Sequence, residues 1–176
     1  MKKTNLVLKM SLTALLAGSV GTATADVVDG TATANVIAPL LVTETTAMSF
    51  GDVAGGTAAG TVVLDTAGAR TITGDANALP SAVGTAGVFT VTGEAAKTFS
   101  LAFAAGVLSD GVAAGNNMVV DTFTQTLAAT GNALPGVGSF SVGATLHLGA
   151  SQAAGAYSTA NTATGGAPYT VTANYE

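Results

Sequence analysis

Residues 168–175, with the sequence PYTVTANY, decide the fold class of this chain. Apolar and polar side chains alternate strictly along them, and a period of two residues is typical of a β-strand that turns one face to a core and the other to water. Only Glu176 follows in the sequence, so we expect a strand that either joins a sheet of its own domain or pairs with a partner molecule. The predicted buried face carries Tyr169, Val171, Ala173 and Tyr175.

Further strand patterns precede this one, and turns that contain Gly and Asn separate them. Threonine is abundant on the polar faces, as β-strands favour, and no segment of helical length after residue 25 shows a 3.6-residue period. About seven strands in a chain of this size predict an all-β, immunoglobulin-like antiparallel β-sandwich. We expect a hairpin turn at residues 93–96. The predicted strands lie at residues 31–43, 60–65, 71–73, 88–92, 98–103, 118–127 and 139–148.

The first 25 residues have the pattern of a signal peptide. Three lysines lie within the first nine residues, an apolar run follows at residues 10–20, and small residues precede and include Ala25. This order is the one that a signal peptidase reads. A membrane-spanning helix needs about 20 apolar residues, so this run is too short to serve as an anchor, and no later segment qualifies. We therefore expect export, with cleavage after Ala25.

Removal of residues 1–25 would leave a strongly acidic protein. Only Arg70 and Lys97 would remain against ten acidic residues, which gives a formal charge of −8. Binding to nucleic acid or to anionic lipid requires clustered cations, so we do not expect either. The chain has no cysteine, which excludes disulfides, thiol chemistry and zinc sites built on cysteine.

The sequence offers no constellation of catalytic or metal-binding residues. His147 is the only histidine, and the alternation places it opposite Leu146 and Leu148, on a face that we expect to be in solvent. A catalytic role needs partner groups, and none lies nearby in the sequence. The acidic residues are scattered, whereas calcium sites group several oxygen ligands at close spacing. We expect no enzyme activity, no cofactor and no metal.

Residues 26–36 form a second alternating segment with two interpretations. As a donor strand, this extension would pair with an edge of a neighbouring molecule through main-chain hydrogen bonds and place every second side chain in its groove. As an internal element, it would be the first strand of its own domain, with Pro39 marking an edge. The sandwich domain is expected at residues 37–176 in the donor reading. The row that would face the groove is Val28, Gly30, Ala32, Ala34 and Val36.

Five segments carry a resemblance to a known family, in the order in which that family has them. The chain resembles a large, uncharacterised family of secreted bacterial proteins with a fimbria-like β-domain, catalogued as a domain of unknown function. That family is similar in turn to archaic chaperone–usher pilins and to spore-coat-U-like proteins. The resemblance implies an immunoglobulin-like sandwich and a surface or pilus role, and it supplies no activity. The segments are residues 48–51, 89–94, 140–146, 152–157 and 168–175.

These observations predict a structural subunit of an exported bacterial surface fibre or pilus that assembles by β-strand donation. Its partners would be like subunits in a homopolymer, with a periplasmic chaperone and an outer-membrane usher as assembly factors. The residues expected to contact a subunit or chaperone are the row from Val28 to Val36 given above and, in the last strand, Tyr169, Val171, Ala173 and Tyr175. It would pass through the periplasm to the cell surface. The alternative is a self-complete, monomeric, secreted binding module or adhesin. Aromatic residues make up only 5% of the chain and do not cluster, which does not favour a carbohydrate-binding face.

Overall fold

The computed structural model describes residues 25–80, 82–112, 115–133 and 137–176. The chain divides into two units, residues 1–35 and 36–176. In the first unit, residues 25–35 are exposed and form no regular secondary structure. The predicted signal peptide lies outside the described residues except for Ala25.

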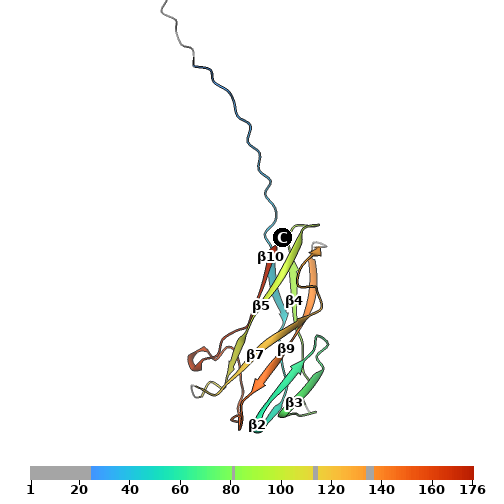
Figure 1. Cartoon of the computed structure of the whole chain (residues 1–176), viewed down its shortest axis with the longest axis vertical. Coiled ribbons are helices and arrows are strands. Elements are labelled where there is room, and N and C mark those ends of the chain that lie inside the picture. The colour runs from blue at the N-terminus through green and yellow to red at the C-terminus, as the bar shows by residue number, and fades with distance from the viewer. Residues whose placement is uncertain (1–24, 81, 113–114, 134–136) are drawn as a thin grey trace, which may run out of the picture. The chain divides into compact units, whose positions relative to one another are not determined.

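The second unit is built from strands, as the alternation predicts (Figure 1). The described residues contain one short 3₁₀ turn, η1 (Thr162–Thr164), and none of their helices is long and apolar enough to cross a membrane. The strands are β1 (Leu41–Thr46), β2 (Val53–Leu64), β3 (Arg70–Ala78), β4 (Gly87–Thr92), β5 (Thr98–Ala104), β6 (Gly106–Ser109), β7 (Asn117–Gln125), β8 (Asn132–Ala133), β9 (Val137–Leu148) and β10 (Thr170–Tyr175).

The strands form two antiparallel sheets. The larger sheet has the order β1-β4-β9-β2-β3, with β7 also paired to β9 and β6 paired to β7, and the smaller sheet has the order β10-β5-β8. Apolar faces of the two sheets pack together, so the predicted all-β antiparallel sandwich is confirmed. β1 and β10 are edge strands, one from each sheet.

The hairpin predicted at residues 93–96 is wrong. β4 pairs with β1 and β9, whereas β5 pairs with β10 and β8, so the connection crosses from one sheet to the other. The physical reason is burial: both strands carry a row of large apolar residues, and each row reaches a core only by facing the opposite sheet. Phe89 of β4 and Phe99 of β5 therefore share one cluster.

The core consists of two clusters, and β9 contributes to both. One cluster lies between the two sheets and includes Phe89, Phe99 and Phe140, with the rings of Phe89 and Phe140 stacked at 5.7 Å between centroids. The other lies where β2, β7 and β9 meet and includes Leu64, Met118, Leu146 and Leu148. The alternation along β9 therefore serves a continuous buried row from Phe140 to Leu148.

The strand predicted at residues 31–43 is wrong over residues 31–40, because regular pairing begins at Leu41. Pro39 has no backbone N–H to give to a ladder. The backbone of Ala38 is bound elsewhere: its N–H donates to Glu94 Oε2 at 3.1 Å, and its carbonyl accepts from Tyr175 Oη at 2.9 Å. Both groups are thus removed from strand pairing just before β1 starts.

Candidate functional site

β10 has the two faces that the sequence predicts. Val171, Ala173 and Tyr175 are half-buried against the cluster between the sheets, and the residues between them are exposed. Tyr169, just before the strand, is also half-buried in that cluster.

One backbone edge of β10 is paired, and the other faces away from its sheet. The Glu176 N–H donates to the Thr98 carbonyl at 3.1 Å, which fixes the phase of the antiparallel ladder with β5. Because neighbouring residues in such a strand point their N–H and C=O groups to opposite sides, Thr170, Thr172 and Asn174 bond to β5. The backbone groups of Val171 and Ala173 therefore point to the outer edge, where the sheet has no further strand.

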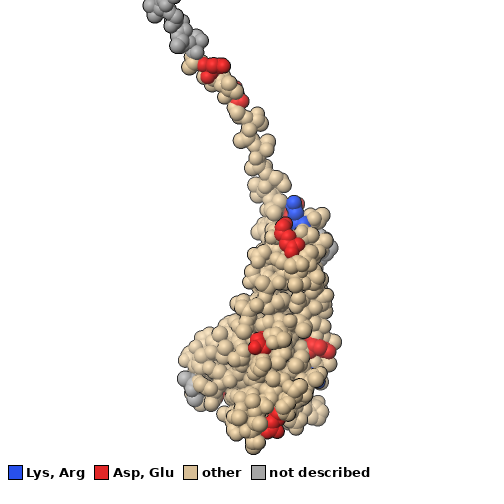
Figure 2. Space-filling model, viewed as in Figure 1, with Lys and Arg blue, Asp and Glu red and all other residues tan. Residues whose placement is uncertain are grey.

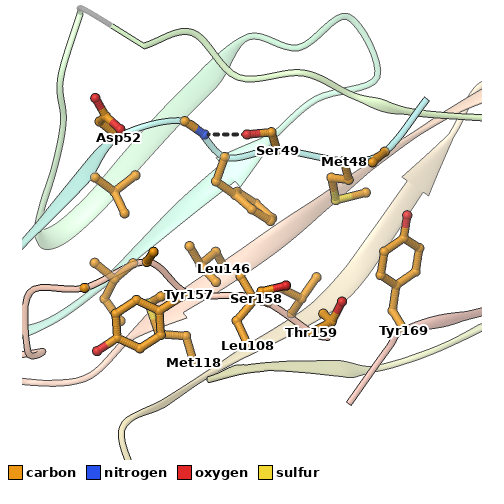
Figure 3. A pocket seen from close by; sticks show the side chains of 18 of the residues that line it. Met48, Ser49, Asp52, Leu108, Met118, Leu146, Tyr157, Ser158, Thr159 and Tyr169 are labelled. Carbon is orange, nitrogen blue, oxygen red and sulfur yellow. Dashed lines mark hydrogen bonds between the residues drawn. The ribbon is translucent and has the colours of Figure 1, made fainter. Parts of the chain in front are cut away.

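A groove of about 960 Å³ lies at the start of this edge, where Val171 is the residue of β10 that lines it. Residues 47–55 form one wall, and residues 152–159 with residues 168–169 form the other, as Figure 3 shows. β1 and β10 reach the groove at one end, through Val42 and Val171.

The floor of the groove is the core of the protein. Leu108, Met118 and Leu146 come from β6, β7 and β9 and point into the space below Met48 (Figure 3). Met118 and Leu146 belong to the second core cluster, and Leu108 packs against it. Met118 and Leu146 are themselves 4% and 1% exposed, so the groove lies over a closed core, beside the place where the edge strands β1 and β10 approach each other.

Tyr169 lies at the end of the groove that Val42 and Val171 line. Its hydroxyl donates to Glu44 Oε1 of β1 at 3.0 Å, and its ring lies 6.3 Å from Phe89 and 5.5 Å from Phe123 between centroids. Burial, and then the neighbouring Glu44 carboxylate, raises the pKa of Tyr169 well above its ordinary value. The hydroxyl therefore stays protonated and able to donate at any physiological pH.

The predicted extension residues are separate from this site in the chain. Val28, Gly30, Ala32 and Ala34 lie in the first unit, and all are exposed. Val36 begins the second unit and is 92% exposed. Val28 and Val36 are therefore two large apolar side chains that are exposed to solvent.

His147 is exposed, as predicted, and the structure gives it a partner that the sequence did not reveal. Its Nε2 lies 2.8 Å from Asp121 Oδ1, on the neighbouring strand β7. Hydrogen bonds from His147 and then from Thr122 lower the pKa of the Asp121 carboxyl. Asp121 and His147 are 26 positions apart, and a single sequence does not show that their strands pair.

Charged groups do not gather at the groove. On the face that Figure 2 shows, acidic side chains are scattered over the surface. In the described part of the chain, no three histidine or acidic residues lie close enough to hold a metal ion.

Comparison with known proteins shows that a family model matches the part of the chain that lines the groove. The family model described as Domain of unknown function (DUF4402) matches residues 40–175. This range includes every strand of the sandwich and excludes residues 26–36. None of the curated proteins and none of the solved structures matches the chain.

Proposed function

We propose that this chain is a structural subunit of an exported bacterial surface fibre or pilus. The chain belongs to the family described as Domain of unknown function (DUF4402). Subunits would join when the extension of one copy enters the groove of the next. The observation that carries the proposal is the groove over apolar core residues at the start of β10, whose outer backbone edge is unpaired.

The extension has the properties of an occupant for that groove. Residues 26–36 would span about 36 Å as a strand, at roughly 3.3 Å per residue. The polar row that begins at Asp29 would stay in water, and the row of Val28, Ala32 and Val36 would face the apolar floor. Backbone groups of Val171 and Ala173 would supply the main-chain pairing.

An exported subunit with an open groove needs protection before assembly. Unpaired strand edges beside apolar surface promote aggregation. A periplasmic chaperone that covers the groove, and an outer-membrane usher that exchanges it for the next subunit, would meet this need. The resemblance to fimbria-like proteins in the sequence supports the same partners and a final location at the cell surface.

Two matched double variants test the proposal in the mature protein, residues 26–176. Ala32→Asp with Ala34→Asp places two charges in the row that faces the groove, where burial without partners is costly. Thr31→Asp with Thr33→Asp adds the same charge to the outward row. We expect the first pair to reduce polymer formation at least about tenfold and the second to leave it nearly unchanged. Size-exclusion chromatography and electron microscopy would measure assembly.

Two results would contradict the proposal. One is equal assembly of both double variants, because the row that faces the groove would then have no special role. The other is a wild-type protein that stays monomeric and does not bind a free peptide of residues 26–36. That second result would favour the self-complete binding module instead.

A further inference from the structure

We propose that Tyr169 and Tyr175 form a clasp that holds β1 against β10 and that must open before a donated strand can pair with the outer edge of β10. The clasp comprises these two tyrosines with Glu44, Ala38 and Glu94. The inference rests on the proposed function, because it assigns the residues that control entry to the same groove.

The first contact of the clasp lies at the end of the groove that Val42 and Val171 line. The Tyr169 hydroxyl crosses from the start of β10 to the Glu44 carboxylate on β1. Glu44 is exposed, while the Tyr169 ring is half-buried between Phe89 and Phe123. A hydrogen bond to an ionised carboxylate is stronger than one between neutral groups. The bond thus joins the two edge strands directly.

The second contact lies six residues further along the same row. The Tyr175 hydroxyl donates to the Ala38 carbonyl at 2.9 Å and accepts from the Glu94 N–H at 2.6 Å. The Glu94 carboxylate accepts from the Ala38 N–H at 3.1 Å. These three bonds join the segment before β1, the connection between β4 and β5, and the end of β10.

The clasped edges leave no room for a strand between them. Neighbouring strands lie about 4.8 Å apart, so two strands that flank a third lie about 9.6 Å apart. Cα atoms of β1 and β10 come within 8 Å of one another. An incoming strand can lie in the open groove below Tyr169, but it can pair with the outer edge of β10 only after β1 and β10 separate. The tyrosine contacts oppose that separation.

The rate at which a donor peptide binds tests the clasp. The mature protein would carry Ala32→Asp with Ala34→Asp, so that its own extension does not compete, and would receive a fluorescently labelled peptide of residues 26–36. Tyr169→Phe keeps the ring packing and removes the bond to Glu44, and Glu44→Gln weakens the same bond from the exposed side. We expect each change to raise the association rate constant about tenfold. Tyr175→Phe should raise it similarly.

Thr45→Val is the matched control. The Thr45 hydroxyl donates to the Val88 carbonyl at 3.1 Å, so its loss removes a bond between β1 and β4 and leaves the clasp intact. Its association rate should equal that of the parent. Melting temperatures would show that each variant is folded. If Tyr169→Phe disturbs the core, Glu44→Gln still tests the same hydrogen bond, because the Glu44 side chain is exposed.

The outcomes separate the clasp from the proposed function. If the peptide binds the parent and all variants at one rate, or binds Tyr169→Phe and Glu44→Gln more slowly, the clasp is overturned and strand donation stands. If the peptide binds none of the proteins, both are overturned. Faster binding to the clasp variants alone supports both.

Discussion

At the scale of single residues, Asp121 and His147 show how two exposed groups influence stability across a strand pair. Their contact joins β7 to β9 on the outer face of the larger sheet, away from the groove. The His147 hydrogen bond is the largest cause of the lowered pKa of Asp121, and the Thr122 hydroxyl is the next. A carboxyl whose pKa is lower in the folded state stabilises that state when it is ionised.

The sign of the pH dependence follows from that direction. The contribution is fully present above the ordinary aspartate pKa of about 3.9 and disappears as the pH falls through the lower folded-state value. We expect His147→Asn to reduce the free energy of unfolding by less than about 1 kcal/mol at pH 6, because both side chains are exposed to solvent. The loss should become smaller as the pH falls below the ordinary aspartate pKa.

Urea unfolding of a double-variant cycle would measure this pair. Asp121→Asn and the double variant complete the cycle with His147→Asn. If the pair is the cause, the double variant should be no less stable than the less stable single variant. An additive loss, or a loss that does not shrink in acid, would refute the assignment.

At the scale of elements, β10 combines a half-buried row with an exposed row. Val171→Asp would place a charge against the cluster that contains Phe89 and Phe99. We expect it to reduce the free energy of unfolding by about 2 kcal/mol, at the level of a lost apolar side chain plus an unfavourable charge. Thr172→Asp, on the exposed face of the same strand, should change it by less than about 0.5 kcal/mol. Chemical denaturation would compare them, and equal losses would contradict the assigned faces.

The sequence predicts the strands with strong alternation and misses those without it. β4, β9 and β10 lie close to their predicted ranges, because each has a row of buried or half-buried side chains that repeats every second residue. β7 also lies close to its range, but its less exposed row changes face at the irregularity between Asp121 and Thr124, which the alternation did not predict. β6 and β8 are four and two residues long, too short to show a period. The error at residues 31–40 arises because alternation alone does not report that Ala38 is bound by Glu94 and Tyr175.

The candidate site depends on contacts that a single sequence does not contain. The predicted face of β10 follows from alternation alone. The groove, however, requires residues 47–55 to lie opposite residues 152–159, and the Tyr169–Glu44 bond joins positions 125 residues apart. These pairings follow from the sheet order, in which β4 and β5 enter different sheets. The hairpin prediction placed these two strands next to each other in one sheet, so the position of the unpaired edge of β10 could not be predicted.

At the scale of the whole molecule, the proposed export predicts where the mature chain begins. If the signal peptide is read as predicted, N-terminal sequencing of secreted protein should begin at Asp26. Replacing Ala23 and Ala25 with Leu should block this processing, because the peptidase requires small residues there. Secreted protein that retains Met1 would contradict the prediction, as would unchanged processing of the Leu variant.

The central position of β9 has a consequence for the kinetics of folding. β1 pairs with β4, and β2 pairs with β3, but among the strands that the structure describes these two ladders join in one sheet only through β9. Residues 137–148 come late in the chain, and pairing over such long separations is slow. If the chain is exported N-terminus first, as we propose, it would hold two unconnected ladders until most of it has crossed the membrane. It would then expose strand edges for the longest time during translocation, before the groove itself exists.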